Sequence, residues 1–178
     1  MNKEGSFKPV VIVLIISMLI AFFWNSLNFL RNGVHAVLNP TLGALINWNV
    51  NIGMTIVVLL ITVITTVVQK YTTDQETLKD LKKQQKEMNE KAKQHRSDPQ
   101  KMLEIQKEMA PLSIKMMKLS MRAFVFTAIP LLLFIRWFMD FFNTIGNPKI
   151  FGFFSWLWFY ILGSLIISAI LRKIMKIV

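Results

Sequence analysis

Four apolar stretches divide the chain, and each is close to the length of one membrane crossing. They cover residues 9–24, 52–68, 123–142 and 151–171. A helix needs roughly 20 apolar residues to cross the hydrocarbon core of a bilayer. The pattern predicts an all-α membrane protein with a three-helix core, preceded by an N-terminal apolar helix.

The first apolar stretch has two interpretations. A short basic region followed by an apolar run is also typical of a secretory signal, but no small-residue cleavage site follows "FFWNSLNFL". We therefore expect an uncleaved anchor, with a signal as the alternative. The next residues mix apolar side chains with Asn, Arg31 and His35, as in a helix that lies in the outer membrane interface. We expect His35 to be an interfacial side chain rather than a metal ligand.

The long polar stretch between the second and third apolar runs has a heptad pattern. Its second half alternates steps of three and four without a break, at Met102, Ile105, Met109, Leu112, Met116 and Leu119. Its first half carries a weaker seam from Leu78 onward. "TDQE" at Thr73 is typical of a capping box, and Asp98 before Pro99 of a helix N-cap. These features predict an antiparallel coiled-coil hairpin.

Charge gives this arrangement an orientation. Residues 70–122 hold 13 Lys and Arg against 8 Asp and Glu, a net charge of +5, and both termini are also basic. Cytoplasmic flanks of membrane proteins carry the excess of Lys and Arg. We expect a multi-pass plasma membrane protein whose hairpin and C-terminus are cytoplasmic. The expected parts are an anchor helix (1–30), an outer interfacial segment (31–50), a core span (51–69), the hairpin (70–122), a core span (123–143), an outer loop (144–150), and a core span with a basic tail (151–178).

Composition narrows the function. Hydrophobic residues make up 53% of 178 residues, so there is no room for a large catalytic domain beside the membrane part, and the chain has no cysteine. No Ser/His/Asp grouping, glycine-rich phosphate loop or HExxH motif occurs. We expect no enzymatic activity, no cofactor and no metal site.

Polar residues in the second apolar stretch share one face of a helix. At about 100° per residue they form a narrow stripe, and polar side chains at membrane depth usually face protein or a wet cavity. A structural helix contact is the alternative, because Thr also bonds its own helix backbone. The stripe consists of Asn51, Thr55, Thr62, Thr66 and Gln69.

Two charges interrupt the third apolar stretch. Arg136 and Asp140 are four residues apart, so a salt bridge along one helix is the expected arrangement. Arg136 is about 20 Å from the cytoplasmic face and therefore lies in the outer leaflet.

The hairpin carries basic residues near its tip and methionines near the membrane. The basic residues form either a solvated face or a contact for phosphate groups of ribosomal RNA or lipid. Met117 and Met121 lie outside the seam and are candidates for an adaptable apolar surface, with gap filling as the alternative. The basic residues are Lys82, Lys83, Lys86, Lys91, Lys93, Arg96 and Lys101.

The order of parts resembles the archaeal YidC-like proteins of the Oxa/Alb/YidC insertase superfamily. The resemblance covers Ile46 to Lys176, with a span, a hairpin and two further spans that close with "FFSWLWFYILGSLIISAILRK". It implies that nascent membrane proteins, delivered by ribosomes, pass into the bilayer through a polar groove without nucleotide hydrolysis. The polar stripe of the second apolar stretch would line the groove, and Met117 and Met121 would form its entrance.

One departure from the superfamily concerns charge. Bacterial members carry a groove arginine in the first core span, which has none here, so Arg136 replaces it only if it faces inward. The bacterial peripheral spans are also absent, which implies either a minimal version or one assisted by partner membrane subunits. The alternative function is a scaffold whose hairpin binds a soluble partner.

Overall fold

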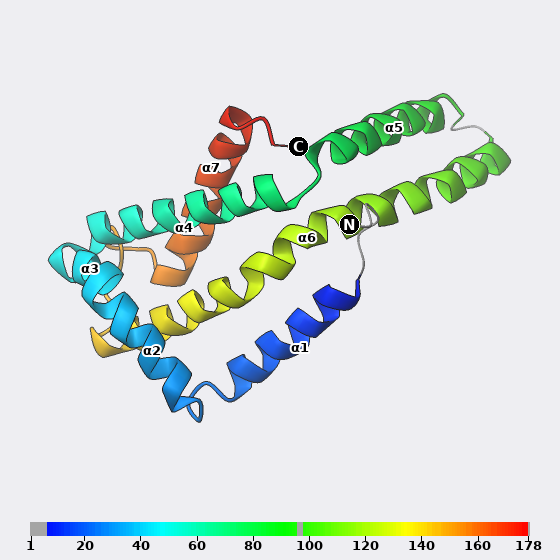
Figure 1. The fold of residues 1–178 in the computed structure, drawn as a ribbon. Helices are drawn as coiled ribbons and strands as arrows, with labels where there is room; N and C mark the ends of the chain where they lie inside the picture. The colour runs from blue at the N-terminus through cyan, green and yellow to red at the C-terminus, as the bar shows by residue number, and fades with distance from the viewer. Residues whose placement is uncertain (1–6, 96–97, 178) are drawn as a thin grey trace.

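The computed structural model describes residues 7–95 and 98–177, and this part of the chain is helical without strands. The predicted all-α class is therefore confirmed. Figure 1 shows the order of the elements along the chain. They are α1 (Lys8–Phe22), α2 (Asn28–Leu38), the π-helical turn η1 (Asn39–Gly43), α3 (Ala44–Trp48), α4 (Val50–Thr72), α5 (Gln75–Gln94), α6 (Pro99–Thr144) and α7 (Trp156–Ile174).

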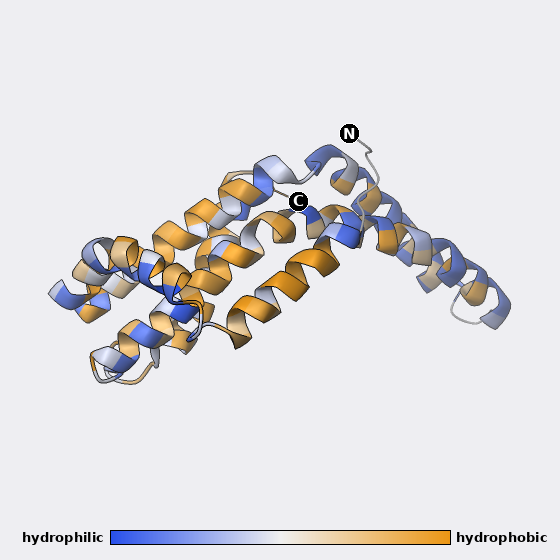
Figure 2. Ribbon diagram, turned by 60° about the horizontal axis from the view of Figure 1, so that its bottom comes forward, coloured by the Kyte–Doolittle hydropathy of each residue, from blue (hydrophilic) through white to orange (hydrophobic). Residues whose placement is uncertain are grey.

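Three of these helices, α4, α6 and α7, are long and apolar enough to cross a membrane. Figure 2 shows hydrophobic residues concentrated on them and on α1, whereas the hairpin is mostly hydrophilic. The 15 residues of α1 extend about 22 Å, less than the roughly 30 Å of a bilayer core. That α1 anchors the chain in the membrane stays a prediction.

The helix α6 joins the second arm of the hairpin to the following span without a break. Its 46 residues extend about 69 Å and include Pro111 and Pro130. The first arm, α5, lies antiparallel beside it (Figure 1). Leu78 and Leu81 of α5 are buried against Leu119 of α6. A helical hairpin is therefore present, and regular coiled-coil packing along it stays a prediction.

Side-chain caps fix where the helices begin. The Asp98 carboxylate accepts from the backbone N–H groups of Gln100 and Lys101, both at 3.2 Å, which confirms the predicted N-cap. The first arm is capped by Asp74, which accepts from the Thr77 N–H at 3.0 Å, rather than by Thr73 as predicted. Thr73 is instead the C-cap residue that follows α4.

An aromatic core holds the spanning helices together at the end of the bundle away from the hairpin, called the far end below. Trp137, Phe138 and Phe142 of α6 are fully buried there, against Met54 and Val57 of α4. The Phe142 and Trp156 rings stack with centroids 5.8 Å apart, which ties α6 to the start of α7. This core positions the three helices from which the candidate site is built.

Candidate functional site

The three spanning helices enclose a cavity of about 250 Å³ in the half of the bundle next to the hairpin, called the groove below. Small and polar side chains dominate its lining. Because these side chains are short, they leave space where larger apolar ones would close the contact. The groove is lined by Thr62, Thr65, Thr66 and Gln69 from α4, Ala123, Thr127 and Leu131 from α6, and Tyr160, Ser164, Leu165, Ser168 and Arg172 from α7.

Four hydroxyl groups in the lining donate hydrogen bonds to backbone carbonyls of their own helices. Thr62 Oγ1 donates to the Val58 carbonyl at 2.7 Å, and Ser164 Oγ donates to the Ile161 carbonyl at 2.9 Å. Thr65 and Thr127 make equivalent bonds. A hydroxyl oxygen retains acceptor capacity after donating its proton. The groove is therefore rich in hydrogen-bond acceptors.

One cation lies in the groove lining, at its hairpin end. Arg172 Nη2 donates to Gln69 Oε1 at 3.0 Å and so links the ends of α7 and α4. In the sequence Arg172 resembles part of the basic tail. Its spacing of four residues from Ser168, and eight from Ser164, places all three on one helix face and is the signal that would have identified it. The predicted stripe also omitted Thr65, which lines the groove and lies three residues after Thr62.

The predicted stripe on α4 divides into two parts. Thr62, Thr66 and Gln69 come together in the groove lining. Asn51 and Thr55 are not among the described lining residues, and their assignment to the groove is corrected. They lie at the far end, where the aromatic core fills the space between the helices. There Asn51 Oδ1 accepts from the Phe151 N–H at 2.7 Å, and the exposed Thr55 donates to the Asn51 carbonyl.

The predicted ion pair between Arg136 and Asp140 is also corrected. Asp140 Oδ2 instead accepts from Trp24 Nε1 and Arg31 Nε, both at 2.9 Å, and contacts His35 Nε2 at 3.0 Å. These three partners come from the segment between α1 and the end of α2. They lie more than 100 residues away in the chain, so helix spacing alone gave no sign of them.

Arg136 has a different role from the one its spacing suggested. Its guanidinium donates to the Ala21 carbonyl, in the last turn of α1. The last carbonyls of a helix lack partners within the helix and form the negative end of its dipole, so a cation is favourable there. Arg136 therefore fastens α1 to α6, and it does not supply the groove with a cation.

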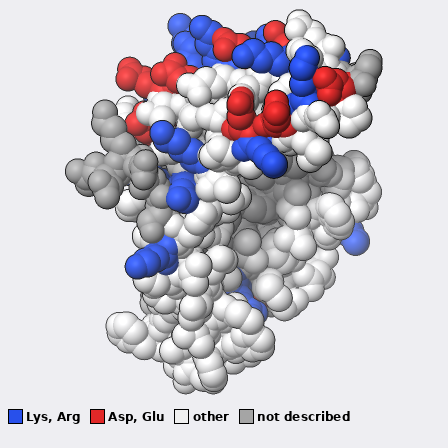
Figure 3. All heavy atoms as spheres, turned by 90° about the vertical axis from the view of Figure 1, so that its right-hand side faces the viewer, with Lys and Arg blue, Asp and Glu red and all other residues white. Residues whose placement is uncertain are grey.

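The methionines and basic residues lie on the hairpin side of the groove. Met117 is 45% exposed, and Met121 is partly buried, on the two turns of α6 before the groove begins. Figure 3 shows basic and acidic side chains together over the hairpin. Arg96 lies outside the described residues; the other predicted basic residues are exposed: Lys82, Lys83, Lys86, Lys91, Lys93 and Lys101.

Among residues 7–95 and 98–177, no group of three or more His, Asp and Glu side chains is arranged to hold a metal ion. The lining of the groove suits contacts with polypeptide or water, because it offers hydroxyl, amide and guanidinium groups without a carboxylate.

Comparison with known proteins gives one family. The model of the family described as "Integral membrane protein EMC3/TMCO1-like" matches residues 39–151, which is more than half of the chain and includes α4, the hairpin and the whole of α6. Searches of curated proteins and of solved structures give no match. The matched family is linked to membrane protein insertion and chaperone function. The chain belongs to the EMC3/TMCO1-like family of integral membrane proteins, within the Oxa1/Alb3/YidC-type insertase superfamily.

Proposed function

We propose that this protein receives short hydrophobic segments of nascent membrane proteins and passes them into the bilayer through the groove. The observation that carries the proposal is the line of hydroxyl-bearing residues between three spanning helices, in the half of the bundle next to the hairpin. Arg172 at the hairpin end adds a donor to the acceptors deeper inside. The process requires no bond to be made or broken, so the protein acts without catalysis.

The physical benefit of the groove concerns the polar flank of the substrate. An unpaired backbone polar group in hydrocarbon costs several kcal/mol, which opposes movement of a hydrophilic flank across the membrane. Hydroxyl oxygens and the water they hold satisfy part of that requirement over the hairpin half of the membrane. The hydrophilic flank crosses the remaining thickness of the membrane while the apolar segment enters lipid.

The hairpin is proposed to meet the ribosome on the cytoplasmic side of the plasma membrane. Six exposed lysines offer charge for phosphate groups without base-specific contacts. Exposed Met117 lies between the hairpin and the groove and would hold the apolar segment in transit. Replacing Lys82, Lys83 and Lys86 with Gln should weaken ribosome co-sedimentation, most strongly at low salt; sedimentation that does not change would reject the ribosome contact alone.

The groove itself is tested by photo-crosslinking in reconstituted membranes. A photoreactive amino acid replaces Thr66 in the groove, and a matched variant carries it at Thr55, which is exposed on the same helix outside the groove. The partner is a ribosome-bound nascent chain with one apolar segment. We expect adducts from position 66 several-fold above those from position 55. Equal adducts from both positions would reject the groove as the path.

A filling variant supplies the functional readout. Ser168 lines the groove, whereas Ala169 is exposed beside it on α7. Ser168→Leu should block insertion of the same segment, and Ala169→Leu should leave it unchanged. Full insertion by a folded Ser168→Leu variant would favour the scaffold alternative.

A further inference from the structure

A second concavity lies between α2 and α6, and it differs from the groove in its chemistry. Its volume is about 420 Å³, and its walls are apolar. The α2 wall precedes the part of the chain that matches the family, so this feature belongs to the chain's own N-terminal region. The concavity, called the α2 cleft below, is lined by Phe29, Leu30, Gly33, Val34, Val37 and Leu38 from α2 and by Ile129, Pro130, Leu133 and Phe134 from α6.

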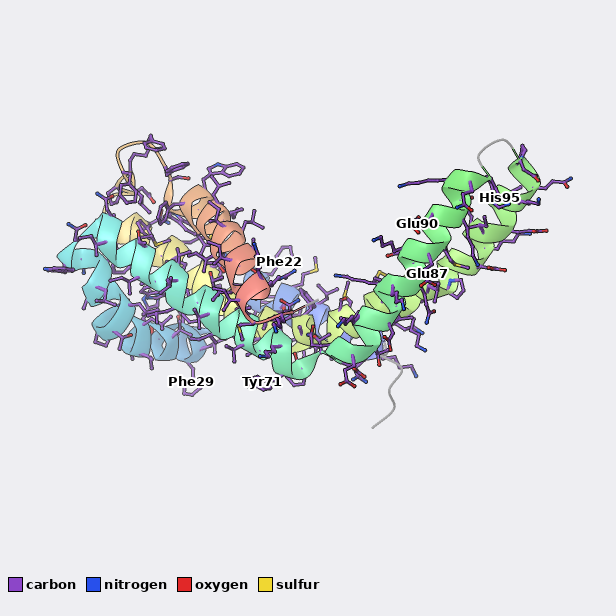
Figure 4. All side chains as sticks on the ribbon, turned by 90° about the horizontal axis from the view of Figure 1, so that it is seen from above. Phe22, Phe29, Tyr71, Glu87, Glu90 and His95 are labelled. Atoms are coloured by element: carbon purple, nitrogen blue, oxygen red, sulfur yellow. The ribbon has the colours of Figure 1, made fainter. Side chains whose placement is uncertain are left out.

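The α2 cleft is open because of two features of α2. Gly33 has no side chain, and a Cβ added there would meet nothing within 4 Å. Phe29 projects away from the bundle at the rim, as Figure 4 shows, and is 94% exposed. The polar side of the same helix holds Arg31 and His35 against Asp140. The helix is therefore fastened to α6 by polar contacts, and Val34 and Leu38 pack on the far-end core. The surface at Gly33 and Phe29 is left uncovered in the described chain.

Size decides what fits in the α2 cleft. A helix is about 10 Å across with its side chains, so three turns of one would occupy roughly 1,200 Å³. That is nearly three times the volume of the cleft. A single extended hydrocarbon chain is much narrower and needs no polar partner, which matches the apolar walls beside a spanning helix.

The positive charge beside the cleft is complementary to the phosphate group of a phospholipid. Arg31 joins α2 to Asp140, and Arg136, one turn before Asp140 on α6, joins α1 to the same helix. The two arginines outweigh the single carboxylate, so these three side chains have a net positive charge. The Arg31 side chain is 38% exposed, and its bond to Asp140 uses only Nε. The terminal nitrogens of a guanidinium are well suited to phosphate oxygens.

We infer that the α2 cleft binds one membrane phospholipid, with a hydrocarbon chain between α2 and α6 and its phosphate group at Arg31. This lipid would fill the surface that Gly33 and the outward-pointing Phe29 leave open and would hold α2 against the bundle. The inference does not depend on the insertion role, because the lipid site and the groove lie on different faces of α6.

The test is photo-labelling of the full chain in phosphatidylcholine nanodiscs. A minor fraction of phosphatidylglycerol carries a diazirine at the end of one acyl chain, and adducts are mapped by peptide. Peptides with Ile129–Phe134 report the cleft, and peptides with Ile166 and Ile170, both exposed on α7 and outside the groove lining, report general contact with lipid. We expect cleft peptides to be labelled several-fold more than the α7 peptides.

Two substitutions on α2 provide the matched comparison. Gly33→Leu places a side chain in the open cleft, whereas Ala36→Leu adds the same side chain at an exposed position that does not line it. Gly33→Leu should lower cleft labelling several-fold, and Ala36→Leu should leave it unchanged. Equal labelling of cleft and α7 peptides, or labelling that Gly33→Leu does not change, would overturn the lipid site.

Separate results test the position of the lipid head group and the identity of the molecule in the cleft. Arg31→Gln should lower the labelling, whereas Asp140→Asn, which weakens the same contact but keeps the cation, should lower it less. Equal labelling in Arg31→Gln and the unchanged protein would overturn the assignment of the phosphate to Arg31. Native mass spectrometry that finds a helix of another protein bound, and no lipid, would assign the cleft to that helix instead.

Discussion

The two halves of the three-helix bundle use the same helices but are filled in different ways. At the far end, Trp137, Phe138 and Phe142 close the space between α4, α6 and α7. Next to the hairpin, Thr66, Ser168 and other small polar residues leave the groove open. The comparison shows that side-chain size and polarity along continuous helices set where a membrane bundle is sealed and where a polar cavity remains.

The closed half should be the main source of stability. Replacing Trp137 with Ala removes a fully buried ring and the hydrogen bond from its Nε1 to Asn39 Oδ1 at 2.8 Å. We expect a loss of about 3–5 kcal/mol in the free energy of unfolding, measured by denaturation in micelles. Trp158→Ala is the control, because Trp158 is 61% exposed and should change stability by about 0.5 kcal/mol. Equal losses in both variants would contradict a sealed far end.

Close backbone packing in the closed half gives the next effect. A Cβ at Gly53 would overlap the Leu45 carbonyl of α3, so Gly53→Ala should force α3 away from α4. We expect a loss of about 1–3 kcal/mol in the same denaturation assay. Gly33→Ala, where a Cβ meets nothing, should instead stabilise α2 by up to about 1 kcal/mol. A similar gain from both substitutions would show that α3 does not pack on α4 in this way.

The attachment of α2 tests whether the far end extends beyond the three helices. Asp140→Asn weakens the acceptor shared by Trp24, Arg31 and His35, and we expect faster hydrogen exchange in α2 with a loss of about 1–3 kcal/mol of local stability. Asp80→Asn, at an exposed position on α5, is the charge-matched control. Unchanged exchange in α2 would show that packing alone holds it.

Much of this architecture follows from the sequence because the signals are local. The lengths of the apolar runs predicted the spanning helices, and Asp98 before Pro99 predicted the start of α6. The side of α4 that faces the groove followed from the spacing of Thr62, Thr66 and Gln69.

The errors came from contacts between distant parts of the chain. Asp140 bonds residues of α2 and of the turn before it, which no helical spacing indicates. Asn51 has the right periodicity for the groove, but the aromatic residues of α6 close the bundle at its level. Periodicity identifies a helix face, whereas the depth at which that face is open depends on side chains from other helices.

The smallest expected effect lies at the hairpin tip. The backbone N–H of Lys101 lowers the pKa of Asp98 below its ordinary value of about 3.9. A lowered folded-state pKa means that the cap stabilises α6 above the ordinary pKa and that this stabilisation is lost as the pH falls through the lower value. The amide resonances of Gln100 and Lys101 should titrate with a midpoint below that of an unperturbed aspartate. In Asp98→Ser, which keeps a cap without a carboxyl, that titration should vanish; a midpoint at or above the ordinary value would contradict the cap.

The difference between the open and closed halves is measured most directly by cysteine labelling. The chain has no cysteine of its own, so single substitutions can be made at Thr65 and Ser168, both partly exposed in the groove, and at Val57 in the far-end core. A membrane-impermeant maleimide is applied to each side of sealed vesicles in turn. The account predicts rapid labelling of positions 65 and 168 from the hairpin side only, with position 57 protected from both sides. Protection of all three positions, in a folded protein, would contradict an open groove.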